Sequence, residues 1–154
     1  MPSRALSPVV GTALLLVVTL VLAGTLGTVA LESTSMRAPS HAAVAVSADA
    51  DADRLTFVHR SGDSLPVDRL RVVVRVDGTP LAHQPPVPFF AAKGFRSGPT
   101  GPFNSAANET WDAGERTSLE LAGTNAPLLD PGDSVAVRIL LDGRLLVAVT
   151  TTAE

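Results

Sequence analysis

The sequence predicts an N-terminal hydrophobic α-helix followed by an all-β exterior domain, built as a small sandwich. Three observations carry this prediction: a long uncharged apolar segment near the N-terminus, short segments that alternate apolar and polar residues after it, and turn-forming dipeptides between those segments. The chain has 154 residues, enough for one domain of ordinary size and too short for two comfortable cores. We therefore expect the helix over residues 6–35, a linker over 36–42 and the β-domain over 43–154.

The apolar segment, residues 6–31, carries no charged side chain. As a helix it is about 39 Å long at ~1.5 Å per residue, more than the roughly 30 Å hydrocarbon core of a bilayer. We therefore expect a helix that can span a membrane. A secretory signal peptide is the alternative, with an apolar stretch of about 7–15 residues that ends in small residues. Thr28, Val29 and Ala30 offer such an ending, so secretion with cleavage after Ala30 stays open.

Small residues recur along the predicted helix. Gly11, Gly24 and Gly27 are typical of helices that pack closely against other helices in an apolar medium, whereas contact with lipid alone does not need them. Ser7 is the only early polar side chain, and Pro8 is acceptable because the first N–H groups of a helix are unsatisfied anyway. These residues predict that the helix packs against other helices.

The start of this segment carries the most specific motif of the chain, Arg4-Ala5 followed by Leu6-Ser7-Pro8-Val9-Val10-Gly11. It resembles the processing site and hydrophobic domain of archaeal type IV pilins, especially haloarchaeal ones. The resemblance implies that residues 1–5 are a leader, which a prepilin peptidase removes by cutting between Ala5 and Leu6, and that the helix is retained. Removal of Arg4 matters because a cation inside a dry helical core would lack both water and a partner. The absence of an early glutamate departs from the bacterial pilins and is usual for the archaeal group.

The same resemblance implies a structural protein without a cofactor, and not an enzyme. The chain is then a subunit of a cell-surface filament with a role in surface adhesion, biofilm formation or cell contact. Its implied partners are other pilin subunits, in a homopolymer or heteropolymer, the prepilin peptidase, the pilus assembly ATPase and the membrane platform. Arg4 is the sole basic flank before the helix, so the positive-inside rule places the C-terminus outside. We expect the chain in the cytoplasmic membrane before assembly and in the extracellular pilus afterwards.

Other functions follow from the same sequence. The runner-up is a single-pass membrane-anchored or secreted β-domain that binds a partner and never polymerises. A surface hydrolase is disfavoured because there is no cysteine and no Gly-x-Ser-x-Gly nucleophile elbow. Nucleic acid is excluded as a partner, because all 15 acidic residues but only 11 of the 12 basic residues follow residue 31, and a net negative domain gives no basic footprint.

Beyond the linker the pattern changes to alternation. Leu70, Val72 and Val74 lie on one face of a predicted strand that has arginines on its other face. Asp142-Gly143 predicts a hairpin, because both central positions of a type I′ turn need positive φ, and Asp77-Gly78 predicts a further turn. About six or seven short strands punctuated by Gly, Pro and Asp are typical of a β-sandwich. The candidate strands are residues 43–47, 55–60, 70–76, 116–121, 134–141 and 144–150.

A polar segment between two predicted strands contains His59, Gly62 and Asp63. A His followed shortly by Gly-Asp also resembles a feature of haloarchaeal pilin domains. Side chains so close together in one turn do not generally converge as a catalytic triad. We therefore predict a turn, with Gly62 at a positive φ and Asp63 hydrogen-bonded to the backbone.

No metal site is predicted. Asp49, Asp51 and Asp53 resemble the opening of a calcium loop, but Arg54 and Arg60 stand where that loop needs glycine and glutamate. We interpret the three aspartates as a solvated acidic stretch. The histidines have no local metal-ligand spacing, and we expect surface or turn residues among them: His41, His59 and His83.

Residues 80–103 form a long segment rich in proline and phenylalanine. It holds six of the 12 prolines and four of the five phenylalanines, at Phe89, Phe90, Phe95 and Phe103. Exposed large apolar patches are uncommon on protein surfaces, so we expect these four rings to be buried in a core that is otherwise built from Val, Leu and Ala. A contact with a neighbouring subunit or an attachment surface is the alternative.

Asn108 is the acceptor of the only N-glycosylation sequon, Asn108-Glu109-Thr110. The sequon lies in a polar loop before Trp111, and the expected topology places that loop outside the cell. Asn108 is therefore a candidate glycosylation site.

Overall fold

A computed structural model describes residues 6–33 and 40–154 of the chain. The chain divides into two compact units, one up to Pro39 and one from Ser40 to Glu154. The division falls inside the predicted linker, residues 36–42. Each unit is described by itself below.

The first unit contains a single helix, α1 (Leu6–Ser33). Its side chains are described from Val9 to Ala23, and all of these are exposed in the isolated chain. Consecutive apolar residues such as Leu14, Leu15 and Leu16 give the helix exposed apolar side chains on every side. Among the residues that the structure describes, no helix is long and apolar enough to cross a membrane.

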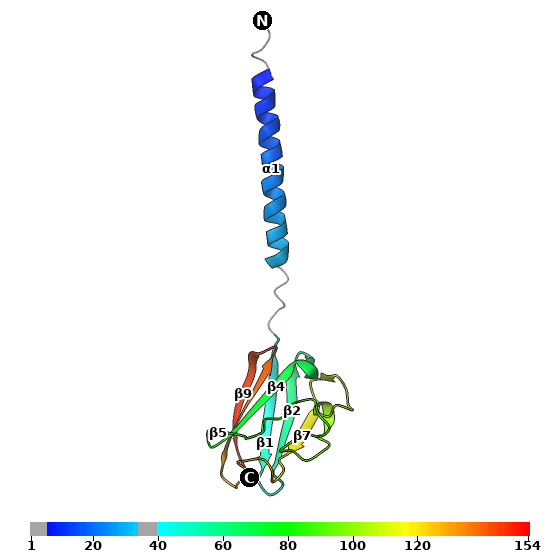
Figure 1. Cartoon of the computed structure of the whole chain (residues 1–154), viewed down its shortest axis with the longest axis vertical. Helices are drawn as coiled ribbons and strands as arrows, with labels where there is room; N and C mark the ends of the chain where they lie inside the picture. Colours follow the sequence, from blue (N-terminus) through cyan, green and yellow to red (C-terminus); the bar gives the residue numbers. More distant parts are fainter. Residues whose placement is uncertain (1–5, 34–39) are drawn as a thin grey trace. The chain divides into compact units, whose positions relative to one another are not determined.

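Two antiparallel sheets make up most of the second unit (Figure 1). One sheet has the strand order β1-β2-β7 and the other β5-β4-β8-β9, and β3 and β6 form a separate pair. The all-β prediction for this domain is confirmed, and the six predicted strands are found with small changes at their ends. The strands are β1 (Ala42–Asp49), β2 (Arg54–Gly62), β3 (Leu65–Pro66), β4 (Leu70–Val76), β5 (Thr79–Pro80), β6 (Thr110–Trp111), β7 (Arg116–Glu120), β8 (Ser134–Leu141) and β9 (Arg144–Thr152).

Alternation along the strands builds the core. Leu55 and Phe57 of β2 are fully buried, as are Val74 of β4 and Ile139 of β8. Because side chains alternate between the two faces of a strand, each sheet places one apolar face inward. The ends of β1 and β9 join the sheets, where the Ala50 N–H donates to the Glu154 carbonyl at 2.8 Å.

Two hairpin turns have the backbone conformation that the sequence predicts. Asp77 and Gly78, between β4 and β5, have φ of 48° and 77°. Asp142 and Gly143, between β8 and β9, have φ of 50° and 77°. Positive φ at both central positions matches the right-handed twist of the flanking strands.

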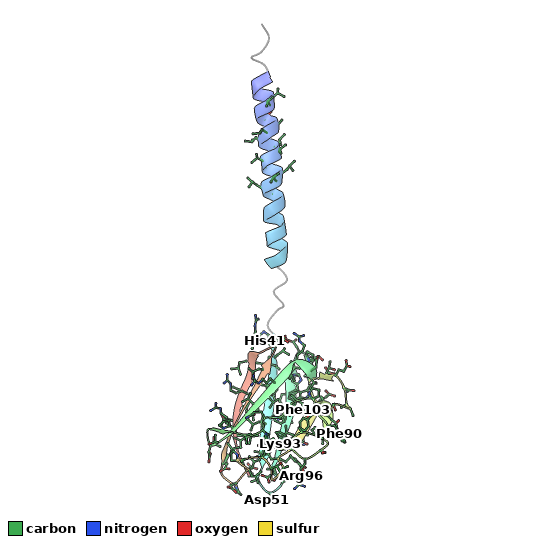
Figure 2. The ribbon with its side chains drawn as sticks, viewed as in Figure 1. His41, Asp51, Phe90, Lys93, Arg96 and Phe103 are labelled. Carbon is green, nitrogen blue, oxygen red and sulfur yellow. The ribbon has the colours of Figure 1, made fainter. Side chains whose placement is uncertain are left out.

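The proline- and phenylalanine-rich segment mainly completes the core. Phe89, Phe95 and Phe103 are buried, and the Phe103 ring lies 5.2 Å from that of Phe57. Phe90 is 59% exposed (Figure 2). The preferred interpretation therefore holds for three of the four rings.

The same segment also covers a sheet edge. The Thr100 N–H donates to the Ser118 carbonyl at 2.9 Å, and the Arg96 N–H donates to the Glu120 carbonyl at 3.0 Å. These bonds occupy the side of β7 that does not pair with β2. An uncovered strand edge would be a template for aggregation.

A glutamine side chain protects the outer edge of β4 beyond the two-residue strand β5. The Gln84 Oε1 accepts from the Val74 N–H at 2.7 Å, and its Nε2 donates to the Val74 carbonyl at 2.9 Å. The amide thus makes the two hydrogen bonds that a neighbouring strand would make at this position.

Candidate functional site

The predicted processing site lies at the N-terminal limit of the described helix. Leu6 is the first residue of α1, with Ser7 and Pro8 in the same turn. Arg4 and Ala5 lie outside the described residues. A cut between Ala5 and Leu6 would remove the leader and leave α1 whole.

The helix glycines lie on different sides of α1. Gly24 and Gly27 are three residues apart and therefore share one face. Gly11 precedes Gly24 by 13 residues, about 220° around the helix at ~100° per residue, so it lies on another side. A Cβ atom added at Gly11 would have no atom within 4 Å beyond its chain neighbours and the nearby backbone of the helix itself. The helix therefore offers small residues for close approach on two sides.

The turn after β2 fastens the first described residues of the β-domain. The Asp63 Oδ2 accepts from the His41 N–H at 2.9 Å, and the Asp63 N–H donates to the His41 carbonyl at 2.8 Å. Gly62 has φ of 119°, and a Cβ atom added there would lie 2.2 Å from the His41 carbonyl oxygen. Only glycine fits this close approach of two backbone segments. The positive φ and the backbone bond of Asp63 agree with the predicted turn.

His59, by contrast, is not a turn residue or a surface residue, and this part of the prediction is wrong. β2 continues to Gly62, so His59 follows Leu55 and Phe57 on the inward face of the strand and is fully buried. Its Nδ1 lies 3.1 Å from the Trp111 carbonyl oxygen, and its ring lies 5.3 Å from the Trp111 ring. The structure therefore does not bring His59 together with the exposed Asp63, and the segment assembles no acid–base pair.

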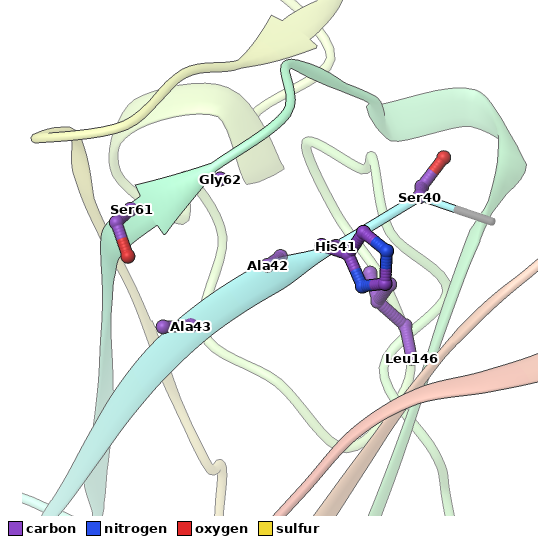
Figure 3. A pocket seen from close by; sticks show the side chains of 7 residues that line it. All are labelled: Ser40, His41, Ala42, Ala43, Ser61, Gly62 and Leu146. Atoms are coloured by element: carbon purple, nitrogen blue, oxygen red, sulfur yellow. The ribbon is translucent and has the colours of Figure 1, made fainter. Parts of the chain in front are cut away.

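A shallow hollow lies beside this turn, between β1 and β9 (Figure 3). Its volume is about 300 Å³. It contains no carboxylate, and within the described residues no group of three or more His, Cys, Asp or Glu could hold a metal ion. The hollow is lined by small polar and apolar residues and one histidine: Ser40, His41, Ala42, Ala43, Ser61, Gly62 and Leu146.

The sequon lies on an exposed loop between η2 (Gly101–Phe103) and β6, and a backbone hydrogen bond fixes the end of this loop. The Glu109 carbonyl accepts from the Val67 N–H at 2.9 Å, and Thr110 begins β6. Asn108 itself is exposed. A glycan on Asn108 would therefore leave the surrounding backbone contacts in place.

Charged side chains on the two sheets differ in their pairing. Glu120 accepts from Arg54 at 2.6 Å, and this hydrogen bond raises the pKa of Arg54. The hydrogen bonds to Asp142 likewise raise the pKa of Arg69. Among the described residues, Arg71 and Arg75 of β4 and Arg138 of β8 form no ion pair, a difference that no local pattern in the sequence predicts. The chain matches no protein-family model and no curated protein.

Proposed function

We propose that this chain is a type IV pilin-like structural subunit of a cell-surface filament. One observation carries the proposal: a helix with exposed apolar side chains on every side begins at Leu6, directly after Arg4-Ala5 in the sequence. Such a helix needs an apolar environment all around it, which lipid or other copies of the helix can supply. Gly11 on one side and Gly24 with Gly27 on another favour close contact with several neighbouring helices.

The β-domain then forms the exterior of the filament. Its apolar side chains are largely buried within its own core, and the free side of β7 and part of the outer edge of β4 are covered by its own backbone and side chains. This organisation suits a self-contained domain that is carried on an assembled helix. The membrane stage before assembly rests on the uncharged residues 6–31, and a role in adhesion, biofilm or cell contact rests on the family resemblance.

The mature N-terminus tests the proposal directly. Mass spectrometry of the protein from the cells that make it should find a chain that begins at Leu6, in filaments visible by electron microscopy. Changing Arg4→Ala and Ala5→Leu together should block the cut and leave full-length chain in the membrane fraction. Arg37→Ala, a basic residue after the helix, serves as the matched control and should be processed normally. A start at Leu31 would establish secretion instead, and an intact leader in the wild-type chain would establish a static anchor.

Glycosylation at Asn108 gives a second prediction. A glycan is bulky and hydrated, so the exposed position of Asn108 accommodates it on the filament exterior. Asn108→Gln and Thr110→Ala should both remove the glycan mass from this peptide, because each destroys the sequon. Both should leave the fold intact and alter interactions between filaments or cells more than assembly. Asn104→Gln, outside any sequon, should keep the glycan. An unmodified Asn108 peptide from native filaments would contradict the prediction, as would loss of the folded domain in the Gln variant.

A further inference from the structure

The outer face of the β5-β4-β8-β9 sheet carries a concentration of positive charge. Arg71 and Arg75 of β4 are exposed on this face, two positions on either side of Val73. Val73 pairs with Arg138 of β8, which is also exposed. The register therefore places an arginine from β8 between the two arginines of β4, at the diagonal spacing where long side chains on neighbouring strands interact. We call Arg71, Arg75 and Arg138 the arginine face.

No ion pair among the described residues involves the arginine face. Beside the arginine face the next strand, β9, places neutral side chains, since Ala148 pairs with Arg138 and Thr150 pairs with Ala136, whereas its Arg144 pairs with Leu141 at the hairpin end. In the described residues of this sheet, acids occur only in the turns at the margins of the face. Asp142 pairs with Arg69, and the Asp77 Oδ1 accepts from the Ser134 N–H at 2.9 Å. Like charges so close together repel one another, so the face is complementary to a negatively charged surface.

One end of the same domain carries the complementary charge. The β1–β2 hairpin, the 130–133 loop and the C-terminus meet there: the Leu129 N–H donates to the Asp53 Oδ1 at 3.0 Å, and the Gly132 N–H donates to the Ala153 carbonyl at 2.9 Å. Figure 2 shows Asp51 at this end of the domain and His41 at the opposite end. We call its exposed acids the acidic end: Asp49, Asp51, Asp130 and Glu154.

We propose that the arginine face of one copy binds the acidic end of the next copy in the filament. The proposal rests on the proposed function, because it names the contact between exterior domains of neighbouring subunits. Arginine presents a planar fork that binds a carboxylate through two parallel hydrogen bonds, so several such pairs can fix an orientation. Two different surfaces of one chain make a heterologous contact, which gives an open helical polymer when the rotation between copies does not close a ring. This is the kind of contact that a filament needs.

Charge reversal in the full-length chain tests this contact. Arg71→Glu with Arg138→Glu should lower the yield of sheared filaments about tenfold or more, because each reversal places like charges together across the contact. Asp51→Arg with Asp130→Arg should do the same. The four changes combined should restore most of the yield, because the charges are exchanged rather than lost. Arg60→Glu with Arg116→Glu, exposed arginines on the other sheet, is the matched control and should leave the yield unchanged.

Processing at Leu6 is measured in every variant. It distinguishes a failure of the contact between the arginine face and the acidic end from a failure of the proposed pilin-like function. Normal processing with unchanged filament yield in the reversal variants, or no restoration in the combined variant, overturns the contact and leaves the filament role intact. Altered surface attachment with normal filaments also overturns it and assigns the arginine face to an outside ligand.

Should the wild-type chain form no filaments, the proposed function fails, and cross-linking decides the contact. The sequence has no cysteine, so Ala148→Cys and Asp51→Cys each introduce a single thiol. Detergent-solubilised full-length copies of the two variants, mixed with a short bismaleimide, should give a heterodimer that Arg71→Glu with Arg138→Glu abolishes. No heterodimer, or one that survives these changes, overturns the contact.

Discussion

Replacing Trp111 with alanine is expected to lower the free energy of unfolding of the β-domain by about 3–5 kcal/mol, a large part of the stability of a typical domain. Trp111 is fully buried. Its ring lies 5.2 Å from Phe103 and 5.3 Å from His59, and its Nε1 donates to the Glu115 carbonyl at 3.3 Å. Removing the ring leaves a cavity between β6, β2 and the proline- and phenylalanine-rich segment. These three elements cannot all move inward to fill it.

Hydrogen exchange of the full-length chain in detergent, followed by mass spectrometry, measures this loss. The relevant signal is the protection of β4 and β8 amides, which report opening of the core rather than of the termini. Fluorescence is unsuitable because Trp111 is the only tryptophan. Phe90→Ala is the control: its ring is 59% exposed, so the change should be within about 0.5 kcal/mol. Equal protection in the two variants would show that Trp111 does not support the core.

Gly62→Ala is expected to have the second-largest effect, a loss of more than about 2 kcal/mol. Two causes act together. The φ of 119° is unfavourable for any residue with a side chain, and the new methyl group would lie 2.2 Å from the His41 carbonyl oxygen and 2.7 Å from the Ala42 Cα. Both neighbouring atoms belong to the backbone, so relief requires separating β1 from the β2–β3 turn.

Gly143→Ala separates these two causes. Gly143 also has a positive φ, 77°, but a Cβ atom there would have no atom within 4 Å beyond its two chain neighbours. Its substitution should therefore show the conformational effect alone, about 1 kcal/mol. The same exchange measurement, applied to the amides of β1 and β2, should show a clearly larger loss for Gly62→Ala than for Gly143→Ala. Equal losses would mean that the contact with His41 does not constrain the turn.

Local patterns in the sequence were sufficient to predict the longer strands of the β-domain. The alternation in β4 and β8 predicted both strands with the bounds that the structure shows, and Asp142-Gly143 predicted the turn that follows β8. The two-residue strands β3, β5 and β6 were not predicted, because a segment of two residues is too short to show any period. Their pairing is decided by contacts between distant parts of the chain.

The errors and omissions at the candidate site have the same origin. His59 looked like a turn residue because Arg60, Ser61 and Gly62 after it are polar or flexible, yet the ladder with β1 continues to Gly62 and places His59 inside. The arginine face was partly visible as alternate arginines before and within β4. The place of Arg138 in it depends on the pairing of β4 with β8, which no local pattern in the sequence reveals.

The paired hydrogen bonds between His41 and Asp63 also determine how the β-domain bears mechanical load. A pull on the chain at Ser40 reaches the domain through His41, at the head of the ladder that runs from Ala42 opposite Gly62 to Asp49 opposite Arg54. Tension along β1 loads this ladder in shear, so that its hydrogen bonds resist together, whereas a strand peeled sideways breaks them one at a time. The His41–Asp63 pair holds the first rung, where peeling would begin. Tension that enters at Ser40 is therefore shared along the whole ladder, because the His41–Asp63 pair keeps β1 from peeling at its first rung.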